Sequence, residues 1–188
     1  MKDTSVRKPI LLIDCDDVMG NFCEVWITYL NRKYHKSYTI EDITDWDISK
    51  FYPGTKEEFF ECTRKRRFWK RIQPSNMSQF FIEALEHDFD IHILTAGNYD
   101  TILLRVKEVI KKYFPFISEK KVICCQNKQM VKGDYLIDDN IDNLIGGDYK
   151  GILFTTPHNK NIDENQYGVV RVNNWKEAYQ YLEGQVDG

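Results

Sequence analysis

Short apolar runs separated by helical patterns constrain the fold of this chain most. The first run, residues 10–13, reads Ile-Leu-Leu-Ile and is followed directly by an acidic cluster. Uninterrupted apolar runs of this length are typical of strands that are buried on both faces of a sheet. We expect five such strands, at residues 10–13, 91–95, 122–125, 135–138 and 151–155.

Helical patterns fill the stretches between these strands. Apolar residues recur at the spacing of one helix face from Phe22 onward and again between residues 102 and 113. In the second of these helices the side chains expected to face inward are Ile102, Leu103, Val106, Val109, Ile110 and Tyr113. A final helix is expected to open on a capping box at residues 174–177 and to end at Gly184. Strands alternating with helices predict an α/β fold, in which a parallel sheet has helices on both faces.

The stretch from residue 20 to residue 88 interrupts this alternation. It is rich in aromatic and charged residues, and Pro53-Gly54 marks a turn within it. We interpret residues 20–88 as a small helical cap inserted after the first strand, where it covers one edge of the sheet. Residues 1–19 and 89–188 would then form the core.

Reactive side chains follow three of the predicted strands. Asp14 and Asp16 follow the first strand, Thr95 ends the second, and Asp138 and Asp139 end the fourth. Because ligands bind at the carboxyl ends of parallel strands, we expect these side chains to share one edge of the sheet. Clustered carboxylates repel each other unless a cation relieves them, and oxygen-only ligands suit Mg²⁺. The pattern therefore predicts a magnesium site.

Each of these features also has an ordinary structural interpretation. Acidic residues often cap strand ends and helix starts, and the Thr-Ala-Gly sequence at residues 95–97 is compatible with a simple turn. A single lysine such as Lys128 is usually solvated at the surface. Two acidic clusters at the ends of neighbouring predicted strands favour a functional site over these alternatives.

These features, in their order along the chain, resemble the haloacid-dehalogenase-like phosphohydrolases. The family pattern is a strand ending in D-x-D-x-[T/V], a strand ending in Thr or Ser, a Lys, and a strand ending in an acidic pair. The matching segments are residues 13–18, Leu94-Thr95, Lys128 and residues 137–139. The resemblance covers nearly the whole chain and implies a HAD-like, Rossmannoid three-layer core.

The chain resembles the 5′(3′)-deoxyribonucleotidase branch more closely. Residues 14–22 match its acidic motif ending in Phe, Lys128 stands ten residues before the Leu-Ile-Asp-Asp of residues 136–139, and residues 154–159 match F-T-x-x-H-N. Two positions depart from the branch. Asp17 replaces a glycine, and Asn140 stands where some relatives carry an Arg that touches the base.

The resemblance implies a Mg²⁺-dependent phosphomonoesterase that works through an aspartyl phosphate. Asp14 would attack phosphorus, and Asp16 would protonate the leaving alcohol and then activate the hydrolytic water. Asp14, the backbone carbonyl of Asp16 and Asp138 would hold the metal, with Asp139 acting through water.

The resemblance also implies how the substrate is held. Thr95, the Ala96 N–H and Lys128 would bind the phosphoryl oxygens, while the cap aromatics Phe22 and Trp46 would stack on the nucleobase. Phe22 has an alternative place in the core, because it begins an apolar helix face with neighbouring residues.

A basic run at residues 64–71 is the main hint of a different function. Six of its eight residues are Lys or Arg, and Phe68 and Trp69 lie between them. The run predicts either a solvated helix face or a nucleic-acid-binding surface, which would make the protein a polynucleotide phosphatase or a binding module. The net charge of −3 favours the solvated face.

We expect the substrates to be small nucleotides, most specifically deoxynucleoside monophosphates, with another small phosphate ester as the alternative. No apolar run reaches the length of a membrane span, and the five cysteines lack metal-binding spacing, which together predict a cytoplasmic protein with reduced thiols. Neither a membrane nor nucleic acid is expected as a partner, and a homodimer is left open.

Overall fold

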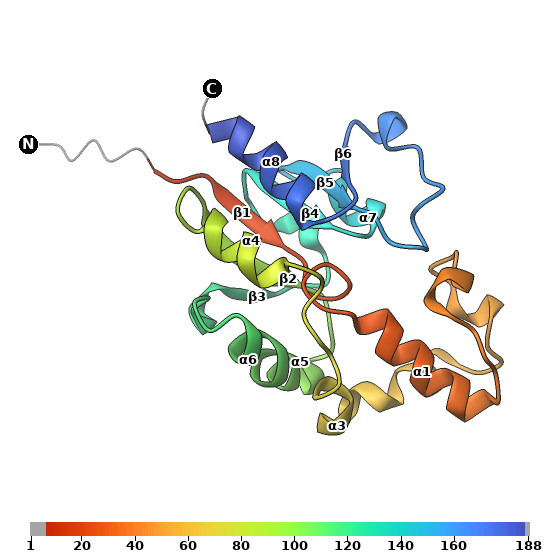
Figure 1. Cartoon of the computed structure of the whole chain (residues 1–188). Helices are drawn as coiled ribbons and strands as arrows, with labels where there is room; N and C mark the ends of the chain where they lie inside the picture. Colours follow the sequence, from red (N-terminus) through yellow and green to blue (C-terminus); the bar gives the residue numbers. More distant parts are fainter. Residues whose placement is uncertain (1–6, 187–188) are drawn as a thin grey trace, which may run out of the picture.

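A computed structural model describes residues 7–186 and shows one parallel sheet with helices packed around it (Figure 1). The described strands are β1 (Ile10–Ile13), β2 (Asp90–Thr95), β3 (Val122–Cys124), β4 (Tyr135–Asp138), β5 (Lys150–Phe154) and β6 (Val170–Val172). Their order in the sheet is β3-β2-β1-β4-β5-β6, and every neighbouring pair is parallel. The five predicted strands are confirmed, whereas β6 was not predicted.

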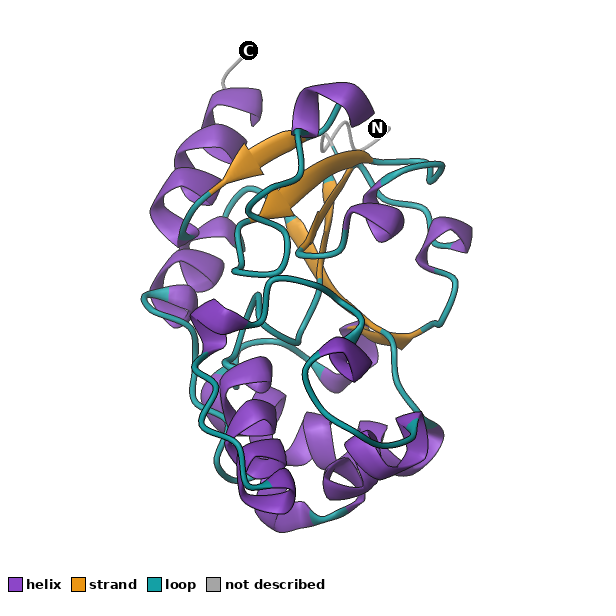
Figure 2. Cartoon of the chain, turned by 90° about the vertical axis from the view of Figure 1, so that its right-hand side faces the viewer, coloured by secondary structure: helices purple, strands orange, loops and turns teal. Residues whose placement is uncertain are grey.

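The sheet is buried on both faces, as the apolar strand sequences require. In β1, Leu11 and Ile13 belong to one apolar cluster, and Leu12 between them belongs to another. Successive strand side chains point to opposite faces, so this division marks two separate interfaces. Figure 2 shows the strands between the helices, and the three-layer α/β prediction is confirmed.

Helices α4 (Ser78–Leu85) and α8 (Trp175–Val186) lie on one face of the sheet, and the short helix α7 (Ile141–Leu144) lies on the other. Helices α4 and α8 pack against each other and contribute Ile82, Leu85 and Leu182 to the larger cluster. Helix α7 contributes to the smaller cluster on the opposite face. Both layers therefore shield the central strands from water.

The inserted segment places most of its helices away from the sheet. Helix α1 (Phe22–Tyr34) and helix α3 (Arg66–Trp69) lie together below the sheet in Figure 1, and α2 (Lys56–Phe60) lies between them in the chain. Helix α4 also falls inside the predicted cap, yet it packs on the core helix α8, where Phe81 and Tyr179 have ring centroids 5.5 Å apart. The division of the chain at residues 20 and 88 stays a prediction.

The helix expected at residues 102–113 is interrupted by a wide turn. It consists of α5 (Tyr99–Arg105), a π-helical segment (Val106–Ile110) and α6 (Lys111–Tyr113). A π turn adds a residue and shifts the helix face. The expectation that Leu103 faces inward is therefore wrong: Leu103 is 76% exposed, while Val109 and Ile110 are buried.

Short 3₁₀ turns complete the described elements. They lie at Ile40–Asp42, Ile48–Lys50, Glu61–Arg64, Glu119–Lys121, Lys128–Met130 and Glu164–Tyr167. The final helix opens as predicted, because the Asn174 side chain accepts the Glu177 N–H at 3.0 Å. It does not end at Gly184 but continues to Val186. Within residues 7–186, the helices are all too short or too polar to cross a membrane.

The loop after β1 is fixed from two directions. Trp175 of α8 donates its indole N–H to the Val18 carbonyl at 3.0 Å. Asp17 adopts a left-handed conformation with φ of 60°, and its carboxylate accepts the Cys23 N–H at 2.8 Å. Glycine is the residue best suited to this conformation, and Asp is among the few others that adopt it. The left-handed turn explains why Asp17 can stand in place of the glycine of related sequences.

We expect Trp175→Ala to lower the free energy of unfolding by about 3–5 kcal/mol, because Trp175 is fully buried and its loss leaves a large cavity beneath the loop. Trp46→Ala is the matched control: this tryptophan is 46% exposed, and its loss should cost less than about 1 kcal/mol. Urea denaturation of both variants checks the prediction, and equal losses would contradict it.

Candidate active site

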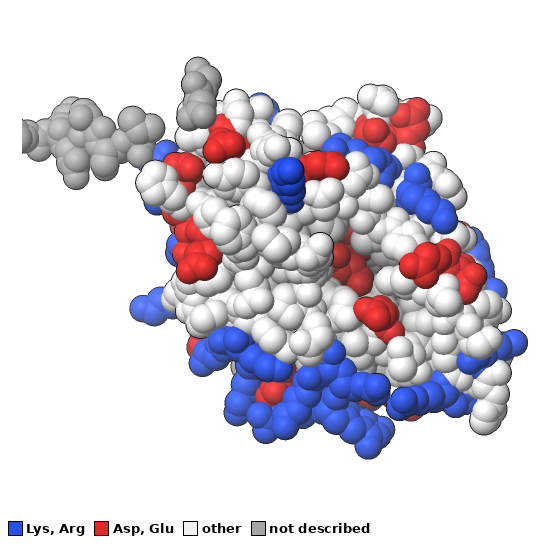
Figure 3. Space-filling model, viewed as in Figure 1, with Lys and Arg blue, Asp and Glu red and all other residues white. Residues whose placement is uncertain are grey.

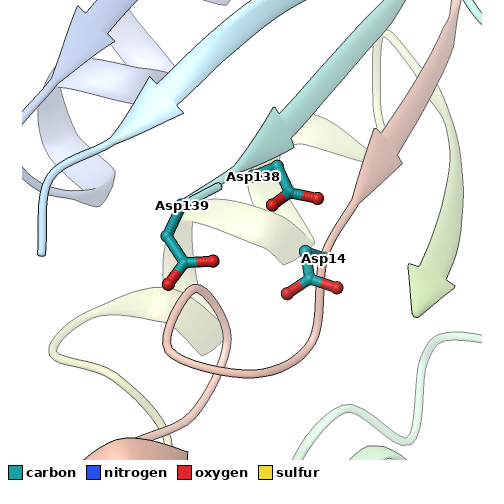
Figure 4. A group of neighbouring side chains, drawn as sticks. All are labelled: Asp14, Asp138 and Asp139. Carbon is teal, nitrogen blue, oxygen red and sulfur yellow. The ribbon is translucent and has the colours of Figure 1, made fainter. Parts of the chain in front are cut away.

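Three buried carboxylates converge at the carboxyl ends of the two central strands (Figure 4). Asp14 follows β1, and Asp138 and Asp139 end β4, whose register pairs Ile13 with Ile137. One oxygen from each carboxylate lies within 4.8 Å of the others, and all three residues are buried. The structure therefore brings together residues that are about 125 positions apart in sequence, as the parallel topology predicts.

Lys128 lies between two of these carboxylates. Its Nζ is 2.5 Å from Asp14 Oδ1 and 2.6 Å from Asp138 Oδ2, and the residue is only 1% exposed. Burial by itself lowers the pKa of a lysine, but the charges of Asp14 and Asp138 overcome this effect and raise the pKa of Lys128. Lys128 is therefore a buried cation, and the solvated alternative is excluded.

Thr95 and Asp16 lie on either side of a buried arginine. Thr95 is fully buried at the end of β2, and its Oγ1 accepts a hydrogen bond from Arg105 Nη1 at 2.7 Å. The same guanidinium donates from Nη2 to Asp16 Oδ2 at 2.5 Å and from Nη1 to the Ala96 carbonyl at 2.8 Å. Arg105 thus joins the loop after β1 to the turn after β2.

Asp139 is held by the loop that follows β5. His158 Nε2 lies 2.9 Å from Asp139 Oδ2 and 2.7 Å from Thr156 Oγ1. Asn159 donates its side-chain amide to the Asp139 backbone carbonyl at 2.7 Å. This explains the histidine and asparagine of residues 154–159, which were recognised in the sequence without a role: they fix the second acid of the pair.

Burial and mutual repulsion disturb the acid–base properties of the carboxylates. Burial raises the pKa of Asp138 to about 7, and the nearby charge of Asp14 adds to this. Burial likewise raises the pKa of Asp16 to about 6, against the opposing effect of Arg105. The pKa of Asp139 is also raised by burial, although its hydrogen bond to His158 opposes the change. The ionised site is therefore short of positive charge.

The carboxylates of the described site outnumber the two side chains, Lys128 and Arg105, that carry a permanent positive charge. Asp14, Asp16, Asp138 and Asp139 carry four negative charges when ionised, against Lys128 and Arg105. Two negative charges then remain uncompensated in a buried, oxygen-rich position. These donors fit a hard divalent cation, which prefers oxygen ligands and removes the repulsion.

The two predicted base-stacking residues lie in different surroundings. Phe22 is buried and packs against Trp26, Phe68 and Trp69 at centroid distances of 5.3–5.9 Å, as its core alternative predicts. Trp46 is half exposed, and its ring lies 3.9 Å from that of His158. Trp46 therefore connects the inserted segment with the loop that holds Asp139. The stacking of either ring on a nucleobase stays a prediction.

The basic run at residues 64–71 forms an exposed surface away from the carboxylates. Figure 3 shows Lys and Arg side chains gathered where α3 and α6 lie, and acidic side chains in a recess nearer the sheet. Arg66 pairs with Glu108 at 2.5 Å, and the other five basic residues of the run have no ion-pair partner among residues 7–186. The surface is solvated as expected, and nucleic-acid binding by it stays a prediction.

Arg105 is the site residue that the sequence did not indicate. An arginine within an amphipathic helix normally faces water, and the expected face of residues 102–113 did not include this position. The π turn directly after Arg105 changes the direction in which the preceding helix faces, so the guanidinium points into the site. Sequence periodicity carries no signal for such a turn.

Comparisons with known proteins agree with this geometry. Residues 8–186 match the family described as 5′ nucleotidase, deoxy (Pyrimidine), cytosolic type C protein. A 5′(3′)-deoxyribonucleotidase from Bacillus subtilis is 33% identical over 176 residues, which are 93% of this chain and 99% of that relative. A 5′(3′)-deoxyribonucleotidase from Clostridium acetobutylicum is 32% identical over 183 residues, 97% of this chain and 99% of the relative.

Solved structures show the same fold. The HAD-hydrolase YfnB from Bacillus subtilis, solved bound to magnesium, aligns with a TM-score of 0.60 and 17% identity over 94% of this chain and 99% of that chain. The chain belongs to the deoxy-type 5′ nucleotidase family, within the HAD-like fold. The predicted family and fold are thus confirmed, and the protein is a phosphomonoester hydrolase.

We expect Lys128→Met to lower the free energy of unfolding by about 3–5 kcal/mol at pH 7.5 without added metal, because it leaves two buried carboxylates without their cation. The loss should shrink at pH 5, where Asp138 takes up a proton. Lys132→Met is the control, since Lys132 makes only an exposed pair with Asp148 that is worth less than about 1 kcal/mol. A loss independent of pH would contradict the prediction.

Proposed function

We propose that this enzyme hydrolyses deoxynucleoside monophosphates with Mg²⁺, through a phosphorylated Asp14. The observation that carries this proposal is the buried position of Asp14 beside Lys128 and Asp138, at the convergence of the strand ends. The relatives named 5′(3′)-deoxyribonucleotidase, which cover nearly the whole chain, support the choice of substrate.

The residues present fit a magnesium ion. The Asp14 and Asp138 carboxylates and the backbone carbonyl of Asp16 would hold it, with Asp139 acting through water. When bound, the ion neutralises charge on the phosphoryl group and on the carboxylates around it. The magnesium-bound HAD-hydrolase of the same fold supports this choice of cation.

Asp14 is prepared for attack on phosphorus. Lys128 holds Asp14 Oδ1, which leaves Oδ2 as the oxygen that forms the new bond to phosphorus. As that bond forms, the bond from phosphorus to the sugar oxygen breaks, and a water molecule later returns Asp14 to its free state. An ammonium group has three N–H donors, and two of those of Lys128 are used by Asp14 and Asp138. The third is available for a phosphoryl oxygen.

Asp16 moves the protons of both steps. It gives a proton to the departing sugar oxygen and then takes one from the attacking water. Its pKa of about 6 suits both roles, because each protonation state is accessible near neutral pH. Thr95 Oγ1 and the Ala96 N–H would complete the phosphoryl site at the end of β2, since backbone N–H groups at such a turn can bind an anion.

Substrate selection would fall to the inserted segment. Trp46 is exposed at the boundary between this segment and the core, and an exposed indole can stack on a nucleobase for about 1–3 kcal/mol. Five free cysteines in the chain suit the reducing cytoplasm, where we place the enzyme. Hydrolysis of sugar phosphates in preference to nucleotides would instead favour the alternative small phosphate ester.

We expect Asp14→Asn to lower turnover of dUMP and dTMP by at least about 10³-fold, because an amide cannot form the aspartyl phosphate. Asp142→Asn is the control, since Asp142 is an exposed acid in α7, a few residues after Asp138 and Asp139. Phosphate release from dUMP, dTMP, UMP and sugar phosphates checks both activity and substrate class. Retained hydrolysis in Asp14→Asn would rule out the covalent route.

We expect Mg²⁺ to raise the Tm more at pH 7.5 than at pH 5. The pKa of Asp138 lies near 7 in the folded protein and near 4 when unfolded, so this group favours folding below about pH 4. This stabilisation of the folded state is lost as pH rises through 7. Asp138 is then ionised and repels the other carboxylates, so a bound Mg²⁺ stabilises the fold most. Calorimetry with and without Mg²⁺ checks this prediction. The prediction would be contradicted if Mg²⁺ raised the Tm equally at pH 5 and pH 7.5. It would also be contradicted if Mg²⁺ raised the Tm of Asp138→Asn as much as that of the unmodified protein.

A further inference from the structure

Arg105 is the most unusual charged residue outside the family's recognised motifs. It ends α5, is only 4% exposed, and bridges two site loops through the Asp16 carboxylate and the Thr95 hydroxyl. Burying a guanidinium costs several kcal/mol even when it is paired, so stability alone does not account for its position. Its function should therefore be sought at the site that it touches.

The surroundings are shaped around this guanidinium. A Cβ at Gly97 would lie 2.8 Å from Arg105 Nη1, so any larger residue there would displace the arginine. The Trp69 ring covers the guanidinium at 4.9 Å, which is a favourable cation–π distance. The π turn follows Arg105 directly. A glycine, a tryptophan and an irregular helix turn thus all accommodate one side chain.

The hydrogen bonds of Arg105 leave its two partners oriented toward the substrate. Because Asp16 Oδ2 is held by Arg105, Oδ1 is the oxygen left to exchange a proton with the sugar oxygen. Thr95 Oγ1 accepts from Arg105 at 2.7 Å and donates only a long hydrogen bond of 3.5 Å to the Ala96 carbonyl, so its proton can turn to a phosphoryl oxygen when substrate binds. Arg105 therefore fixes the distance and orientation between the proton-transfer group and the phosphoryl site.

We propose that Arg105 is a positioning residue, which sets Asp16 for proton transfer to the leaving oxygen and is itself held by Trp69 of the inserted segment. This inference rests on the proposed function. Trp69 is fully buried and packs on Phe22, so the guanidinium lies between the inserted segment and the site. Only a planar fork reaches both partners at once, so a lysine cannot replace Arg105.

Comparison of two substrates tests this role. A sugar alkoxide must be protonated as it leaves, whereas the weakly basic p-nitrophenolate leaves without a proton. We expect Arg105→Ala to lower kcat/KM for dTMP by about 10²–10³-fold, the range of general acid catalysis, because kcat/KM reports on the first step, in which the sugar oxygen leaves. Its kcat/KM for p-nitrophenyl phosphate should fall by less than about tenfold, because the first step with this substrate needs no proton from Asp16. Arg105→Lys should resemble Arg105→Ala, and added guanidinium should restore part of the dTMP turnover of Arg105→Ala.

The control is Arg32→Ala, which removes an exposed arginine from the last turn of α1. Equal losses of kcat/KM on both substrates would overturn the proposal, because Arg105 would then bind the phosphoryl group itself. A wild-type enzyme inactive on nucleotides would refute only the proposed substrate, and the comparison would then use an alkyl phosphate that it does hydrolyse.

A crystal structure of Arg105→Ala gives a readout that does not depend on activity. The Asp16 carboxylate is expected to change its orientation in this variant, because nothing else among the described residues holds its Oδ2. An unchanged Asp16 and Thr95 in a variant that folds normally would overturn the positioning role, whatever substrate the enzyme prefers.

Discussion

The repulsion among buried carboxylates at the end of the sheet is the constraint on which the site depends. Asp14 and Asp138 are both within 2.6 Å of Lys128 Nζ, and without that cation two negative charges would face each other out of contact with water. Lys128 and Arg105 offset only part of the charge. The site therefore still lacks positive charge, which makes it suitable for a divalent cation. With that cation bound, the site can also accept the dianion of a phosphate monoester.

The fold places these charges where repulsion alone would not allow them. β1 and β4 are neighbours in the sheet, so Asp14 and Asp138 are carried together by a register that two apolar cores hold in place. Trp175 then anchors the loop after β1 to the last helix. Side chains distant in sequence are thereby held rigidly, which is what charge stabilisation during phosphoryl transfer requires.

The strands and the central acidic residues could be predicted from the sequence because they depend on local patterns. Four-residue apolar runs identify buried strands, and parallel topology brings their ends together. β6 has only three residues, with Arg171 in the middle, and forms because β5 provides a paired edge. Leu103 and Arg105 were misjudged or missed because a π turn shifts the helix face, and tertiary packing, rather than any local signal, determines such a turn.

The most direct test of the central claim is a crystal structure grown with Mg²⁺ and beryllium fluoride, a mimic of a phosphoryl group on an aspartate. Our interpretation predicts that beryllium fluoride binds to an Asp14 carboxylate oxygen. It also predicts Mg²⁺ at about 2.1 Å from Asp14, Asp138 and the Asp16 carbonyl. Lys128 should contact the adduct. An ion bound elsewhere, or an unmodified Asp14 with Lys128 turned toward solvent, would contradict it.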